Sequence, residues 1–269
     1  MVRHTARPEP RPMVIPGSMR SSAAVAAASR DGSFSLTAPG CHPGRVGALM
    51  TGTDALVHVV RPPTGDPAGA LVLLHGRGTS EYDLRPLLEV LDPHRRLLGV
   101  TPRAPLTLPP GGAHWYISRG IPGPDPKTFD ESFELVSGWL DALLEENGLG
   151  HSRLILGGFS QGTVMSYALG LGAGRPRPRA IIALSGFMPE VPGFELDLAG
   201  LEGYPVALGH GTYDPVIPLE WGERARDRLV EAGADVTWRE SPMPHAVDPD
   251  YLAELAGWIT DVLGDADGA

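Results

Sequence analysis

The sequence has few of the residues that disulfide bonds, zinc sites and nucleic-acid interfaces need. Cys41 is the only cysteine in 269 residues, so no disulfide can form within the chain, and with scattered histidines no Cys/His zinc cluster exists. Lys127 is the only lysine, and the formal net charge at pH 7 is -10. Phosphate binding needs a clustered basic surface, which a chain of this charge seldom offers. We therefore expect neither a metal site nor a nucleic-acid partner.

Long apolar runs are also missing. No stretch of 18 apolar residues occurs, so we expect no membrane-spanning helix and no stable membrane insertion. The one apolar patch near the N-terminus, at 23–28, consists of alanines and one valine, which is too weakly hydrophobic for a signal peptide. We therefore predict a cytoplasmic location.

Charge divides the chain into two parts. Residues 1–49 contain six arginines against two acidic residues, whereas the remainder contains 16 basic and 30 acidic residues. The first part has no hydrophobic period and too little apolar content to offset the entropy lost on ordering. We predict that residues 1–49 are a disordered N-terminal tail or an over-extended gene start, and that residues 50–269 form the folded domain.

Beyond Met50, short apolar runs alternate with helical patterns. Buried parallel strands are typically continuous apolar runs, whereas an amphipathic helix repeats its apolar residues every three or four positions. The predicted strands are 70–74, 97–100, 154–156, 180–184 and 206–208, with edge strands at 57–60 and 236–238. The predicted helices are one to Leu91 with a Ser80/Asp83 capping box, 129–144, 163–169 and 252–262. This order predicts an α/β fold with a doubly wound, mostly parallel sheet in a single domain, which binds ligands at the carboxyl ends of its strands.

The motif Gly158-Phe-Ser-Gln-Gly162 fits G-x-S-x-G and lies between a predicted strand and a predicted helix. A sharp strand-to-helix turn needs glycines around the serine, because side chains there would collide with the neighbouring backbone. Such a turn exposes the serine hydroxyl at the edge of the sheet. Ser160 is therefore our candidate nucleophile.

A serine hydroxyl needs a base to become a nucleophile. His245 lies in a loop after the last predicted strand, and the chain order for this architecture is nucleophile, acid, histidine. Asp214, in a loop held by prolines and a glycine after the strand 206–208, is the best candidate for the acid. Glu190 and Asp197, after an earlier strand, remain alternatives.

Acyl transfer also needs N–H donors for the oxyanion. One is expected at Gln161, directly after the nucleophile, and the other at Arg77, in the Gly-rich loop after the strand 70–74. The Pro/Gly-rich stretch 102–126 follows another strand, and we predict that its Trp115 and Tyr116 line the substrate pocket.

Nucleotide cofactors are not expected. The loop that contains Gly76 and Gly78 lacks the third glycine of a dinucleotide fingerprint, because Glu81 occupies that position. No phosphate-binding lysine follows Gly162.

Four blocks of the sequence resemble the signature blocks of the phospholipase/carboxylesterase family, the relatives of acyl-protein thioesterases. They are Leu73-Leu-His-Gly-Arg-Gly78, Leu156-Gly-Gly-Phe-Ser-Gln-Gly162, His210-Gly-Thr-Tyr-Asp-Pro-Val-Ile-Pro218 and Met243-Pro-His245. The resemblance implies an α/β-hydrolase fold, a cofactor-free serine esterase, and Ser160, Asp214 and His245 as its triad. Two departures are Thr163, where the family often has a second glycine, and Arg77, where an apolar residue is commoner.

We therefore predict a serine hydrolase that cleaves small-molecule carboxylic esters or thioesters with short to medium acyl chains. A lactone or dienelactone hydrolase shares the fold but usually has cysteine at the position of Ser160. A hydrolase-shaped binding protein without turnover is the alternative outside enzymes.

Overall fold

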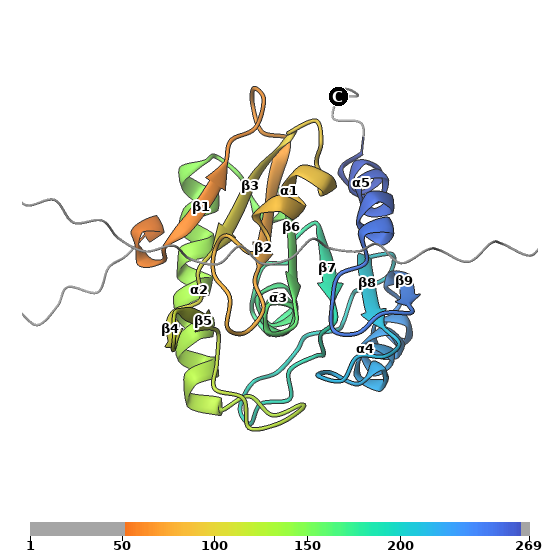
Figure 1. Ribbon diagram of the computed structural model, residues 1–269. Coiled ribbons are helices and arrows are strands. Elements are labelled where there is room, and N and C mark those ends of the chain that lie inside the picture. The colour runs from red at the N-terminus through yellow and green to blue at the C-terminus, as the bar shows by residue number, and fades with distance from the viewer. Residues whose placement is uncertain (1–51, 265–269) are drawn as a thin grey trace, which may run out of the picture. The chain divides into compact units, whose positions relative to one another are not determined.

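The computed structural model describes residues 52–264, which fold around a seven-stranded sheet (Figure 1). Across the sheet the strands are β1 (His58–Arg61), β3 (Leu97–Pro102), β2 (Gly69–Leu74), β6 (Leu154–Phe159), β7 (Ala180–Leu184), β8 (Pro205–Gly211) and β9 (Asp235–Ser241). β1 pairs antiparallel with β3, and the other neighbours pair in parallel. The parallel strands point downwards in Figure 1, so the loops after them gather at the lower edge. The predicted tail lies outside the described residues.

Helices cover both faces of the sheet, which is why its central strands are apolar throughout. The helices are α1 (Arg85–Leu91), α2 (Pro126–Glu146), α3 (Gln161–Leu171), α4 (Leu219–Glu231) and α5 (Pro249–Leu263). In β2, Leu71 and Leu73 pack in one cluster with α1 and α5, whereas Val72 and Leu74 pack in another with α2 and α3. α4 packs against β8 and β9. The sequence-based prediction of a mostly parallel, doubly wound sheet is confirmed.

The predicted capping box at the start of α1 is wrong. The helix begins at Arg85, and no side chain caps its first turn. A helix capped by Ser80 would place Pro86 in its interior, where proline has no N–H to donate and its ring collides with the carbonyl four residues earlier. In the observed helix Pro86 lies in the first turn, where the missing N–H costs nothing.

A short antiparallel hairpin, which the sequence analysis did not predict, interrupts the Pro/Gly-rich stretch. It pairs β4 (Leu106–Leu108) with β5 (Gly112–His114). Ala113 in β5 also forms a bridge with Thr79, and its carbonyl accepts the Gly78 N–H at 2.8 Å. The hairpin therefore fixes the loop after β2 from the side, at the carboxyl edge of the sheet.

Candidate active site

Ser160 lies in a strained turn between β6 and α3. Its φ of 56° and ψ of -119° fall in a backbone region that residues other than glycine rarely adopt. The two motif glycines are required by close approach: a Cβ on Gly158 would lie 2.3 Å from the carbonyl carbon of Gly162, and a Cβ on Gly162 would lie 1.8 Å from the Leu74 oxygen. Backbone strain of this kind costs of the order of 1–3 kcal/mol and is typical of functional sites. The turn has the sharp strand-to-helix geometry that the G-x-S-x-G pattern predicts.

Asp214 and His245 are joined directly. His245 Nδ1 lies 2.6 Å from Asp214 Oδ2. Because a carboxylate only accepts hydrogen bonds, Nδ1 is the donor in this contact. Asp214 Oδ1 accepts the backbone N–H groups of Val216 and Ile217, each at 2.8 Å, so the whole carboxylate is fixed.

A second histidine lies beside this pair but does not compete for the proton. His210 Nε2 is 3.6 Å from Asp214 Oδ2 and donates to the Ile217 carbonyl at 2.9 Å. Burial lowers the pKa of His210, so the ring is neutral near pH 7 and makes no ion pair with Asp214. Its role is to hold the loop that carries the acid.

The structure brings His245 next to the elbow through Phe159. The Phe159 ring packs on the imidazole of His245 with centroids 4.6 Å apart. Within residues 52–264, no hydrogen bond joins Ser160 Oγ to the imidazole. Such catalytic hydrogen bonds are often long in a free enzyme and tighten when substrate is bound.

The alternative acids lie elsewhere. Glu190 lines a separate cavity together with Arg228. Asp197 accepts the backbone N–H of Ala199 at 3.0 Å and lies 3.7 Å from Arg177. Of the three candidate carboxylates, Asp214 is therefore the one that the fold brings to His245.

The loop after β2 approaches the nucleophile closely. A Cβ on Gly76 would lie 3.1 Å from Phe159 Cδ1 and 3.6 Å from Ser160 Cβ, so this backbone faces the elbow. His75 is a structural residue: its Nε2 accepts the Ala104 N–H at 3.0 Å, which leaves Nδ1 to donate to the Gly76 carbonyl at 2.7 Å. Burial lowers the pKa of His75, in keeping with a neutral ring. The loop is thus held in place before substrate arrives.

Gln161 connects the elbow to the wall of the site. Its Nε2 donates to the Tyr116 carbonyl at 3.0 Å, and its Oε1 accepts the Trp115 N–H at 3.1 Å. The backbone N–H of Gln161 is at the first position of α3, where a helix supplies no acceptor. This N–H therefore remains available to a substrate oxygen.

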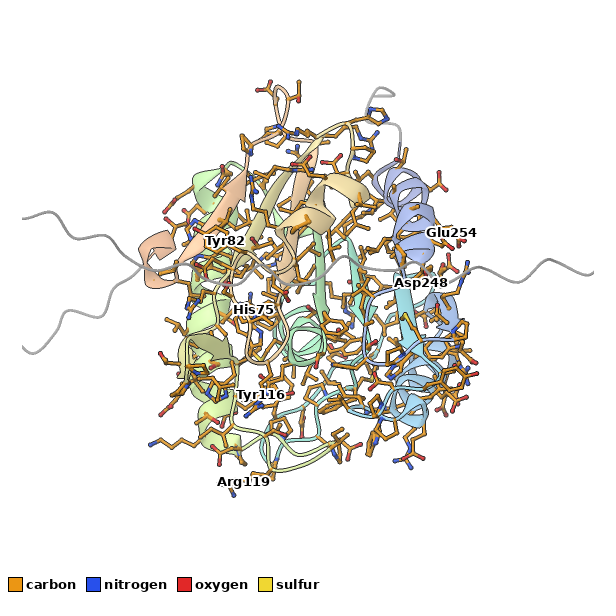
Figure 2. All side chains as sticks on the ribbon, viewed as in Figure 1. His75, Tyr82, Tyr116, Arg119, Asp248 and Glu254 are labelled. Carbon is orange, nitrogen blue, oxygen red and sulfur yellow. The ribbon has the colours of Figure 1, made fainter. Side chains whose placement is uncertain are left out.

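The two predicted pocket aromatics differ in role. Tyr116 lines the cavity next to Ser160, although most of its side chain is buried. Trp115 does not line the cavity, so that part of the prediction is wrong. Its ring is fully buried, and its Nε1 donates to the His75 carbonyl at 2.7 Å. Figure 2 shows His75 and Tyr116 inside the body of the molecule, whereas Arg119 projects at its lower edge.

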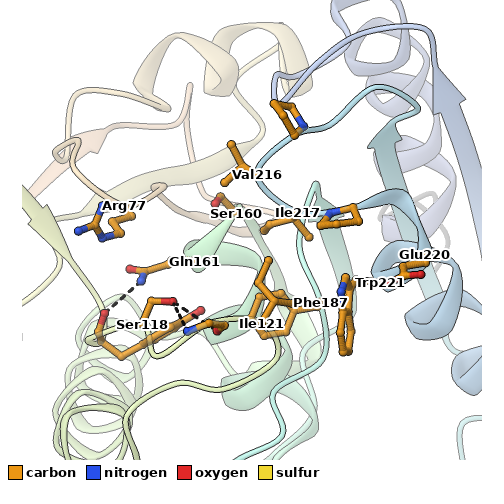
Figure 3. Close-up of a pocket in the computed structure, with 14 residues that line it drawn as sticks. Arg77, Ser118, Ile121, Ser160, Gln161, Phe187, Val216, Ile217, Glu220 and Trp221 are labelled. Atoms are coloured by element: carbon orange, nitrogen blue, oxygen red, sulfur yellow. Dashed lines mark hydrogen bonds between the residues drawn. The ribbon is translucent and has the colours of Figure 1, made fainter.

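The cavity at Ser160 has a volume of about 650 Å³ (Figure 3). Among the lining residues that the sequence did not predict, Phe187, Ile217 and Trp221 form an apolar wall. Phe187 follows the end of β7 within three residues, so its position after a parallel strand was the signal that could have identified it. Trp221 lies in the first turn of α4, where the sequence gives no comparable signal.

Thr163 occupies the position at which the resemblance led us to expect glycine. Its Oγ1 lies 2.7 Å from the Gly158 carbonyl and 2.8 Å from the Leu184 carbonyl, and it accepts the Leu184 N–H at 3.0 Å. Gly186 provides the space for the Thr163 side chain, since a Cβ at position 186 would lie 2.4 Å from that side chain. The hydroxyl therefore ties the ends of β6 and β7 together beneath the nucleophile.

We expect Thr163→Val to lower the free energy of unfolding by about 1–3 kcal/mol, because the buried Leu184 N–H loses its acceptor. Thr163→Ser keeps the hydroxyl and should cost less than half as much. Urea denaturation of the two variants and the unaltered chain measures both values. Equal losses for valine and serine would contradict a role for the hydroxyl.

Among residues 52–264, no group of three or more His, Cys, Asp or Glu side chains is arranged to hold a metal ion. No helix in the same part of the chain is long and apolar enough to cross a membrane.

The sequence pattern of the Phospholipase/Carboxylesterase family matches residues 56–263. The chain belongs to this family. It is 25% identical over 236 residues to acyl-protein thioesterase 1 of Cryptococcus neoformans, covering 78% of this chain and 98% of the relative. It is 28% identical over 238 residues to lysophospholipase-like protein 1 of Mus musculus, covering 81% and 99%.

Solved structures agree with the family assignment. The crystal structure of esterase PE8 superimposes with a TM-score of 0.67 at 27% identity, covering 77% of this chain and 99% of that one. The fold is therefore the α/β-hydrolase fold, as predicted. As a member of this family the chain is a hydrolase of ester bonds.

Proposed function

We propose that the chain cleaves small-molecule carboxylic esters or thioesters through a covalent acyl-enzyme on Ser160. The observation that supports this most strongly is the 2.6 Å contact between Asp214 and His245, at the sheet edge that carries the strained Ser160 turn. A buried carboxylate, an imidazole joined to it and a serine hydroxyl that lines a cavity, in this chain order, are the components of nucleophilic acyl transfer.

The acylation step starts at His245. With its Nδ1–H held by Asp214, Nε2 accepts the proton of Ser160 Oγ as that oxygen attacks the substrate carbonyl. The N–H groups of Arg77 and Gln161 stabilise the oxyanion. When the tetrahedral intermediate collapses, the bond to the alcohol or thiol breaks and His245 returns the proton to the leaving group.

Deacylation repeats these steps with water as the nucleophile. His245 accepts a proton from the water, the oxyanion again accepts from Arg77 and Gln161, and the proton then passes back to Ser160 Oγ. The products are a carboxylic acid and the free enzyme. No cofactor enters this cycle.

The apolar wall formed by Phe187, Ile217 and Trp221 supports a preference for short to medium acyl chains. Each methylene group that finds apolar surface contributes up to about 0.8 kcal/mol, whereas one left in water contributes nothing. We expect kcat/KM for p-nitrophenyl esters to rise from acetate, reach a maximum at medium length and fall beyond it.

The measurement is a series of soluble p-nitrophenyl esters from two to sixteen carbons, hydrolysed by the full chain. A monotonic rise to the longest chain would contradict the medium-chain preference. Absence of turnover across the whole series would contradict the proposed function itself.

A further inference from the structure

The cavity at the nucleophile has a charge at each end. Only two of its lining residues carry charge, Arg77 and Glu220. They lie on opposite sides of Ser160 in Figure 3, with Gln161 on the side of Arg77 and Trp221 on the side of Glu220. The cavity therefore offers a cation at one end and an anion at the other.

Arg77 has no partner in the described part of the chain. No carboxylate lies within 4.0 Å of its guanidinium, and no hydrogen bond to it is formed within residues 52–264. Two arginines of neighbouring loops differ in this respect, because Arg103 pairs with Glu81 and Arg119 pairs with Asp125. The five N–H donors of Arg77 are thus unused at the rim of a catalytic cavity.

The charge of Arg77 also acts on His114, at the end of β5. Burial is the main cause that lowers the pKa of His114, and the charge of Arg77 lowers it further. His114 is accordingly neutral near pH 7 and adds no second positive charge. Arg77 is the only basic side chain among the residues that line the cavity, so recognition of an anion at this end depends on it.

The other end suits an uncharged acyl chain. The rings of Phe187 and Trp221 pack with centroids 6.1 Å apart, and Ile217 completes the apolar wall. Glu220 is exposed next to Trp221, and the Arg224 guanidinium lies 4.6 Å from the centroid of the Trp221 ring, so this end carries charges of both signs around its apolar wall.

We propose that the substrates of this site carry an anionic group, a carboxylate or a phosphate, on the alcohol or thiol portion, where Arg77 binds it. The inference rests on the proposed esterase function and adds a substrate class to it. A guanidinium fork matches both anions because either can accept two parallel N–H bonds.

The test compares six-carbon acyl esters of three para-substituted phenols. The substituent is carboxylate, phosphate or the neutral carboxamide, and the readout is the ratio of kcat/KM for each anionic ester to that for the neutral ester. The ratio removes any general change in activity. In Arg77→Leu we expect it to fall about fivefold, the upper effect of a solvent-exposed ion pair. The anion with the larger ratio in the unaltered chain identifies the group that the site prefers.

Matched variants separate binding from overall charge. Arg85→Leu removes the same charge from an exposed position outside the cavity and should leave the ratio unchanged. Arg77→Lys should keep part of the preference, since it keeps the charge without the fork. The preference should also decrease as salt is raised, because the site is open to solvent.

An unchanged ratio in Arg77→Leu, or an equal fall in Arg85→Leu, would overturn the inference. Neither result affects the proposed function, because hydrolysis of the neutral ester by the unaltered chain tests that separately.

Discussion

Replacing Ser160 with alanine is expected to lower kcat for p-nitrophenyl esters by about 10⁵-fold or more, because removal of the nucleophile leaves only the oxyanion donors and substrate binding. The fold should be retained. Ser160 Oγ makes no hydrogen bond to another side chain or backbone group within residues 52–264, so its loss disturbs no packing. Steady-state rates together with a thermal melt measure both effects.

A matched control is available in α3, the helix that begins directly after Ser160. Ser166 is fully buried in α3, and its hydroxyl donates to the Gly162 carbonyl at 2.9 Å. Ser166→Ala removes a serine oxygen from the same element without touching the site, and should retain activity within a few-fold. More than a few per cent of the original kcat in Ser160→Ala would reject Ser160 as the nucleophile.

Replacing Asp214 with asparagine is expected to lower kcat by about 10⁴-fold, through the tautomer of His245. Asp214 Oδ1 accepts two backbone N–H groups, so the amide oxygen of asparagine takes that position and its NH₂ group points at His245. Nδ1 must then accept, the proton moves to Nε2, and the ring can no longer act as a base towards Ser160. The loss should be smaller than in Ser160→Ala because the nucleophile remains.

The controls are the two alternative candidates for the acid that the sequence did not exclude. Glu190→Gln and Asp197→Asn remove carboxylates that lie away from His245, and both variants should keep near-normal kcat. Near-normal activity in Asp214→Asn combined with an inactive Glu190→Gln would contradict Asp214 as the acid and would assign that role to Glu190, in the loop after β7.

Much of the site was predictable because the fold class fixes where functional residues lie. Parallel strands end at one edge, so residues directly after different strands converge there. Ser160 follows β6, Asp214 follows β8 and His245 follows β9. The structure accordingly brings the three residues to one edge of the sheet. Apolar runs identified the central strands, which are buried on both faces and therefore carry little polar sequence.

The features of the site that the sequence did not predict depend on contacts between segments that are distant in the chain. Which of Trp115 and Tyr116 faces the cavity depends on the β4–β5 hairpin, and that hairpin is held by Gly78 and Thr79 of another loop. A strand reverses its faces with each residue, so an unpredicted hairpin leaves the choice open. The Thr163 side chain fits only because position 186, after β7, is a glycine. No local sequence pattern reveals this dependence between two distant positions.

Labelling with a fluorophosphonate tests the central claim most directly. The reagent reacts with a serine only where a base and oxyanion donors activate it, so peptide mass spectrometry of the labelled full chain identifies the nucleophile. We expect one adduct per chain, on Ser160, and none in Ser160→Ala. No adduct on the folded protein, or an adduct on a different residue, would contradict the assignment of Ser160 as the nucleophile of an ester hydrolase.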